Sequence, residues 1–171
     1  MANPTMTLIG TPITVGSGGA ASFTLSSIPS TYTDIKVVIS ARVSSSATGG
    51  QLCYLVFNGS GYPTSKWLIG SGSAASSNTR SDAYILEVDS ATQTASTFSN
   101  NEFYFPNYAN TSYNKSFSVD SVVENNATAA DSNLVAGIWA STSAITQLDI
   151  IPLSGTFVQY STIYLYGIKN S

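Results

Sequence analysis

The chain contains no histidine among its 171 residues. Histidine is the most frequent general base of enzymes and the most frequent protein ligand of transition metals. Its absence excludes Ser-His-Asp and Cys-His catalysis and every histidine-containing metal site. We therefore expect a protein that is not an enzyme, with no catalytic residue, no cofactor and no metal centre.

Charged side chains are also scarce, at 9% of the chain against roughly 25% in an average soluble domain. Six residues are Lys or Arg and nine are Asp or Glu, which gives a net charge of −3. Nucleic-acid binding needs clustered cations that neutralise phosphates, and no such cluster occurs. Ser, Thr, Asn and Gly supply the polar surface instead, which is common in proteins that work outside cells or within large assemblies.

A single cysteine, Cys53, excludes an internal disulfide. It lies in the apolar run Gln51–Phe57 and is expected to be a small buried side chain. No apolar run approaches the roughly 18 residues of a membrane helix. The N-terminal residues also lack the basic and apolar regions of a secretory signal. The sequence thus predicts no membrane association and no secretion signal.

What the sequence does contain is a series of short segments whose apolar residues alternate with a period of two. Asp34–Val43 and Thr162–Ile168 are the clearest. The other expected strands are Ala21–Ser26, Gln51–Phe57, Ser65–Ile69, Asp82–Val88, Phe98–Phe105, Lys115–Val123, Leu134–Trp139 and Ala144–Leu153. Clusters of Gly, Asn, Ser and Pro separate them, and no segment has a helical stripe. We expect one all-β domain over residues 1–171, a jelly-roll β-sandwich of about 8–10 antiparallel strands without significant helix.

Three segments are harder to place in that sandwich. Residues 1–15 are expected to form an edge strand interrupted around Gly10 and Pro12, and the part from Ala2 to Thr11 is a candidate docking segment. Gly70–Ser81 is composed almost entirely of small polar residues, and we expect a long surface loop or a flap. Residues 89–97 are a second polar stretch without an apolar face that could dock a helix.

Paired carboxylates would allow glycoside hydrolysis without histidine. Asp82, Glu87 and Asp89 lie close in sequence, as do Asp120 and Glu124. The pattern indicates solvated carboxylates at strand ends and in loops, and a glycosidase is the less favoured alternative. No calcium-binding loop of the D-x-[DN]-x-[DN]-G type is present.

Aromatic residues in polar surroundings are the best candidates for an interface. Tyr62, Tyr108 and Tyr113 lie in polar loops, and Trp67 lies in a short strand. Such side chains are enriched in protein interfaces and can stack against sugars. The alternative is that they cap the core at the ends of the sandwich.

Several framework segments resemble a family of small structural proteins of tailed bacteriophages from marine and freshwater bacteria, cyanophages included. The segments that carry this resemblance are Thr7–Ala21, Ile28–Asp34, Phe105–Tyr108, Lys115–Ser121 and Ile163–Lys169. They are strand edges and turns, and none is a catalytic signature. The resemblance spans nearly the whole chain.

The resemblance implies a β-sandwich virion component without enzymatic activity. The first placement is a capsid decoration (cement) protein, a homotrimer bound to the major capsid protein on the capsid exterior after synthesis in the host cytoplasm. The alternative is a tail-fibre, receptor-binding domain that recognises a host surface glycan. The early first strand favours decoration, because a fibre tip usually follows an attachment region and a shaft. The candidate interface residues are Leu8, Ile9, Tyr62, Trp67, Tyr108, Tyr113, Tyr164 and Tyr166.

Overall fold

The computed structural model describes residues 5–123 and 131–169. These residues form thirteen strands and no helix, and neighbouring strands pair antiparallel. In chain order the strands are β1 (Met6–Leu8), β2 (Ile13–Thr14), β3 (Phe23–Leu25), β4 (Asp34–Ala41), β5 (Gly50–Phe57), β6 (Thr64–Gly70), β7 (Ala75–Arg80), β8 (Tyr84–Asp89), β9 (Ser99–Phe105), β10 (Lys115–Val123), β11 (Asp131–Trp139), β12 (Leu148–Pro152) and β13 (Thr162–Ile168). The all-β prediction is confirmed.

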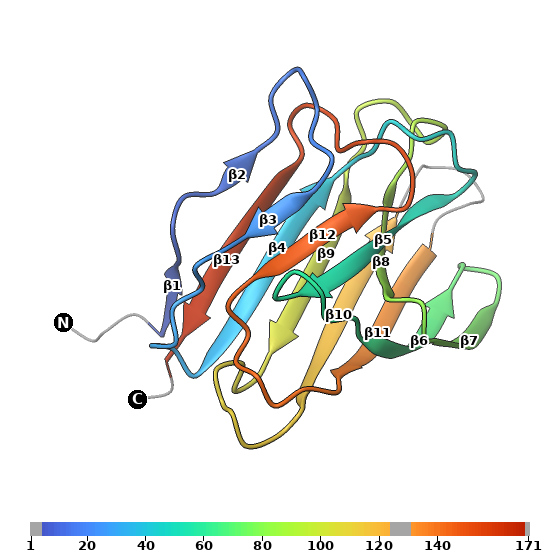
Figure 1. Cartoon of the computed structure of the whole chain (residues 1–171). Coiled ribbons are helices and arrows are strands. Elements are labelled where there is room, and N and C mark those ends of the chain that lie inside the picture. The colour runs from blue at the N-terminus through green and yellow to red at the C-terminus, as the bar shows by residue number, and fades with distance from the viewer. Residues whose placement is uncertain (1–4, 124–130, 170–171) are drawn as a thin grey trace.

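The strands form two sheets that pack face to face (Figure 1). The larger sheet has nine strands in the order β1-β13-β4-β9-β10-β11-β6-β7, with β2 also paired to β13. The smaller sheet has the order β3-β12-β5-β8. The chain crosses repeatedly between the sheets, which confirms the β-sandwich. The jelly-roll topology remains a prediction. The larger sheet contains the consecutive meander β9-β10-β11, and the two sheets differ in their number of strands.

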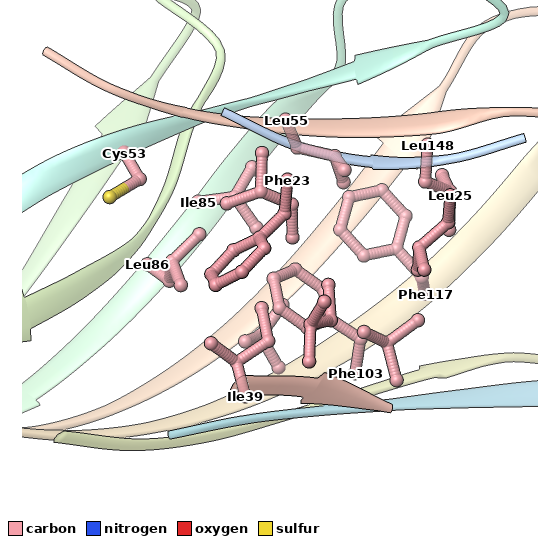
Figure 2. Close-up of a cluster of buried hydrophobic side chains, with 14 of the residues drawn as sticks. Phe23, Leu25, Ile39, Cys53, Leu55, Ile85, Leu86, Phe103, Phe117 and Leu148 are labelled. Atoms are coloured by element: carbon pink, nitrogen blue, oxygen red, sulfur yellow. The ribbon is translucent and has the colours of Figure 1, made fainter. Parts of the chain in front are cut away.

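The core lies between the two sheets, and period-two alternation decides which side chains enter it. In β4, Ile35, Val37 and Ile39 are buried, whereas the residues between them are half-buried on the other face. Figure 2 shows side chains of both sheets meeting in this layer, among them Phe23 and Leu55 from the smaller sheet and Phe103 and Phe117 from the larger. Full burial of each such side chain stabilises the fold by roughly 1.5–3 kcal/mol.

Cys53 lies in the same core and is fully buried, as its apolar run predicts (Figure 2). Burial raises the pKa of the Cys53 thiol well above its ordinary value, and the nearby Glu87 carboxylate raises it further. The low dielectric around the sulfur disfavours the thiolate. Cys53 is a structural residue in this environment.

The prediction that Gly70–Ser81 forms a loop or flap is wrong. Residues 75–80 form β7, which pairs with β6 along its whole length and ends the larger sheet (Figure 1). Only the turn is irregular, with Gly72 at φ 82° and the Ser71 amide bonded to the Ala74 carbonyl at 3.0 Å. All but the last residue of β7 are exposed. Backbone pairing with β6 and the hydrogen bond from Lys66 to Thr79 hold this strand. Its exposed residues show no apolar alternation that could predict a strand.

The N-terminal segment forms an interrupted edge, as expected. β1 pairs with β13 from Met6 to Leu8, and β2 pairs with β13 further along. Between them Gly10 adopts φ 68°, a backbone conformation that residues with a side chain rarely adopt. The first three residues of the proposed docking segment, Ala2 to Pro4, lie outside the described residues.

The 90–97 stretch contains no helical turn. The Arg42 guanidinium organises it by donating hydrogen bonds to three backbone carbonyls, those of Gln93 at 2.9 Å, Thr94 at 2.7 Å and Thr97 at 3.0 Å. A charged donor forms stronger hydrogen bonds than a neutral one. Together with the hydrogen bonds from Ser90 and Thr92 to the Ala47 carbonyl, this cation holds a loop that has no apolar anchor.

Candidate functional site

The outer face of the larger sheet extends across the strands from β1 to β7. It consists of the side chains that point away from the smaller sheet, and cross-strand pairing sorts them into rows. One row comprises Leu8, Tyr166, Lys36, Tyr104, Ser118, Ala136, Lys66 and Thr79, and the next comprises Tyr164, Val38, Glu102, Asp120, Leu134, Leu68 and Ser77. Residues 5–123 and 131–169 form no third layer over it.

The apolar part of the outer face is centred on β6 and β11. Leu68 and Leu134 lie opposite each other and are 53% and 54% exposed, and Ile138 on β11 is 43% exposed. A shallow hollow of about 360 Å³ is lined by Leu68 and Leu134, together with Lys66, Ser118 and Ala136 among others. Neighbouring exposed aliphatic side chains are the usual mark of an interaction surface.

The charges on the outer face are few and balanced. Lys36 Nζ lies 2.6 Å from Glu102 Oε2, and Lys66 donates a 2.7 Å hydrogen bond to Thr79 Oγ1. Asp120 is exposed in the neighbouring row. This near-neutral surface lacks the excess of Lys and Arg side chains that binding to nucleic-acid phosphates requires.

Three of the predicted interface residues share the outer face near its β1 edge. Leu8 is exposed and pairs with Tyr166, which is half-buried. The Tyr164 and Tyr166 rings stack with centroids 6.4 Å apart and planes at 14°. Ile9 is half-buried and packs against the core instead. Both tyrosines point away from the core, and their role in an interface stays a prediction.

Trp67 and Tyr108 were predicted as interface residues, but neither is exposed. Trp67 is buried in the core, where its Nε1 donates to Ser65 Oγ at 2.7 Å. Tyr108 is fully buried; its hydroxyl donates to the Pro29 carbonyl, and its own carbonyl accepts from the Ile145 amide at 3.0 Å. Burial raises the pKa of the Tyr108 hydroxyl. Both side chains belong to the core. For Tyr108 this agrees with the alternative that the loop aromatics cap the core at the ends of the sandwich.

Tyr62 and Tyr113 are exposed, but the structure does not bring them together. Tyr113 lies in the β9–β10 loop, with Lys115 Nζ 5.9 Å from its ring. Lys115 itself is buried, donates to the Tyr113 and Thr142 carbonyls, and has its pKa lowered by that burial. Tyr62 lies beside a hollow on the smaller sheet that Tyr54 and Asp82 also line.

The carboxylates considered for catalysis lie in different environments. Asp82 is exposed and pairs with Arg80, while Asp89 is buried at the end of β8. Glu87 is half-buried, and Asn133 donates to it. Asp120 lies on the outer face, and Glu124 falls outside the described residues.

No group of three or more His, Cys, Asp or Glu side chains that could hold a metal occurs in residues 5–123 and 131–169. The same residues include no helix with the length and apolar character needed to cross a membrane.

Leu68, Leu134 and Ile138 are functional candidates that sequence reasoning missed. Along β11 the outward set is Leu134, Ala136 and Ile138, and the inward set includes Asn133 and Gly137. Because the inward set contains a polar residue and a glycine, the alternation does not show which set faces the core. Only the pairing with β10 and β6 resolves the ambiguity.

Comparisons with known protein families, with curated proteins and with solved structures found no match to this chain.

Proposed function

We propose that this protein is a structural component of a bacteriophage virion, a decoration protein that docks on the major capsid protein through the outer face of the larger sheet. The observation that supports docking is the uncovered cross-strand pair Leu68 and Leu134, with exposed Ile138 on the same face further along β11. The choice of a virion partner rests on the resemblance of the framework segments and on the low charge of the chain.

Many copies of the contact on one shell would compensate for the low affinity of each single contact. The apolar centre is small, and the surrounding Ser, Thr and Lys side chains would give wet, individually weak contacts. A homotrimer on a symmetric shell engages several such faces at once, so the effective concentration raises the overall affinity. The edge formed by Leu8 and Tyr166 would then lie beside a neighbouring subunit.

Copy number in purified virions tests the placement. Quantitative mass spectrometry should find hundreds of copies per particle for a decoration protein, and a few tens or fewer would place the chain in the tail. Absence of the chain from purified virions would overturn the proposal.

Substitutions on the outer face test the docking surface. Leu68→Glu with Leu134→Glu introduces two carboxylates at the apolar centre and should abolish co-sedimentation with capsids, while circular dichroism and the melting temperature remain those of the original protein. Leu153→Glu is the matched control, because Leu153 is also exposed, at 46%, but follows β12 of the smaller sheet. Equal loss of binding in the control would contradict docking through the outer face.

A further inference from the structure

A second surface feature lies on the opposite side of the sandwich. The smaller sheet carries a hollow of about 540 Å³ lined by Tyr54, Val56, Tyr62, Ser81, Asp82, Ala83 and Ile151, which we name the Tyr62 hollow. Its volume falls within the roughly 300–1,000 Å³ of small-molecule sites. Val56 and Ile151 give it an apolar floor, and hydroxyls and a carboxylate stand at its rim.

Two tyrosine rings border the Tyr62 hollow in different ways. Tyr54 is held in place, because its hydroxyl forms a 3.0 Å hydrogen bond with the Tyr84 hydroxyl and the ring centroids are 4.6 Å apart. Tyr62 is 62% exposed, so most of its ring is open to solvent. The hollow thus combines a fixed polar wall with an open aromatic face.

Asp82 supplies an oriented acceptor at the rim. Its Oδ2 lies 3.5 Å from Arg80 Nη1. The Arg80 guanidinium carbon lies over the rings of Trp67 and Tyr84, 5.0 Å and 5.7 Å from their centroids. Within the described part of the chain Oδ1 of Asp82 accepts no hydrogen bond. Because Arg80 balances the charge, the site suits a neutral ligand that donates hydrogen bonds.

The backbone at the Tyr62 hollow is irregular. Ala83 has φ 63°, a conformation that non-glycine residues rarely adopt, and it separates Asp82 from Tyr84. The β5–β8 register shifts between Cys53 and Tyr54. Strained backbone of this kind clusters at ligand sites. The irregular segment borders the hollow directly, since Tyr54, Asp82 and Ala83 all line it.

We propose that the Tyr62 hollow binds a neutral pyranose of a glycan. The sugar stacks the C–H face of its ring on Tyr62, donates a hydroxyl hydrogen bond to Asp82 Oδ1, and exchanges further hydrogen bonds with the Tyr54 hydroxyl. A proline-rich peptide would also fit an aromatic site, but a proline ring has no N–H to donate to Asp82. The site lies on the sheet opposite the docking face, so the inference does not depend on the proposed capsid contact.

The full-length chain should be probed on a glycan array and then by ¹H–¹⁵N NMR titration with methyl glycosides of glucose, galactose, mannose and N-acetylglucosamine. We expect at least one neutral pyranose to bind, with chemical-shift changes confined to the residues around Tyr54, Tyr62 and Asp82. No binding to any array glycan or methyl glycoside would overturn the proposal. Binding of a polyproline peptide at the same residues without sugar binding would overturn it too.

Variants separate stacking from hydrogen bonding. Tyr62→Ala should weaken binding about three- to tenfold, as expected for the loss of one aromatic contact, whereas Tyr62→Phe keeps the ring and should retain affinity. Asp82→Asn should weaken binding by a similar factor. Tyr113→Ala removes an exposed tyrosine outside the hollow and should leave affinity unchanged. An equal effect of Tyr113→Ala, or no effect of Tyr62→Ala, would contradict the assignment.

Discussion

Gly137 on β11 lies directly opposite Phe117 on β10, and the Phe117 ring occupies the space that a side chain at position 137 would need. The ring continues into the core, where its centroid lies 5.6 Å from that of Phe57 and 5.2 Å from that of Phe105. A glycine in the middle of a strand is therefore a packing requirement at this position.

Replacement of Gly137 by Ala should destabilise the protein. A methyl group there would overlap the Phe117 ring, and displacing a core aromatic costs typically about 1–3 kcal/mol. Urea denaturation measures the loss. Gly18→Ala adds the same methyl group where no atom lies within 4 Å, so its free energy of unfolding should change little. Equal effects of the two substitutions would contradict the packing argument.

Strands with one apolar face were predictable from the sequence. The bounds expected for Lys115–Val123 and Thr162–Ile168 coincide with β10 and β13, because both alternate strictly between buried and outward residues. β7 was not predictable, since neither of its faces is apolar and its place in the sheet depends on pairing with β6. Sheet order depends on which distant segments pair, and no local pattern encodes that.

The Cys53 thiol should be unreactive in the native protein. It is fully buried, and its raised pKa keeps it protonated at neutral pH. Iodoacetamide should label it only after denaturation, as measured by intact-mass spectrometry. Ser118→Cys places a thiol on the exposed outer face and serves as the positive control. Labelling of native Cys53 at the rate of that control would contradict the burial.

Removal of the Arg42 guanidinium should loosen residues 90–97. Arg42→Met keeps an apolar stem but leaves three carbonyls without their charged donor, at a cost of about 1.5–3 kcal/mol. Hydrogen exchange should accelerate in that loop more than in the core strands. Lys66→Met, which removes an exposed cation with a single side-chain partner, should leave the exchange pattern unchanged. Uniform acceleration in Arg42→Met would indicate global destabilisation instead.

The candidate site was only partly predictable. Loop position suggested that Tyr62, Tyr108 and Tyr113 were all exposed, but local sequence does not show that the Tyr108 loop closes over the end of the core. Tyr62 was predicted as an interface residue, yet its hollow includes Tyr54, Asp82 and Ile151 from three other parts of the chain. Tertiary packing creates that juxtaposition, so the chemistry of the hollow appears only in the folded protein.

Glu87 makes the stability of the fold depend on pH. Burial raises the pKa of its carboxyl, and the hydrogen bond from Asn133 Nδ2 at 3.1 Å opposes that rise. The native protein therefore binds this proton more tightly than the unfolded chain does. By linkage, the resulting stabilisation is fully present below the unfolded pKa of about 4.3 and is lost as pH rises through the native pKa.

Glu87→Gln removes this titration and keeps an oxygen that can accept from Asn133. The free energy of unfolding of Glu87→Gln relative to that of the original protein should therefore increase between about pH 4 and about pH 7. Urea denaturation across that range measures the difference. Glu102→Gln is the control, because it removes an exposed carboxylate whose partner is Lys36 on the surface. If its stability difference changed with pH in the same direction and to the same extent, burial of Glu87 could not be the cause.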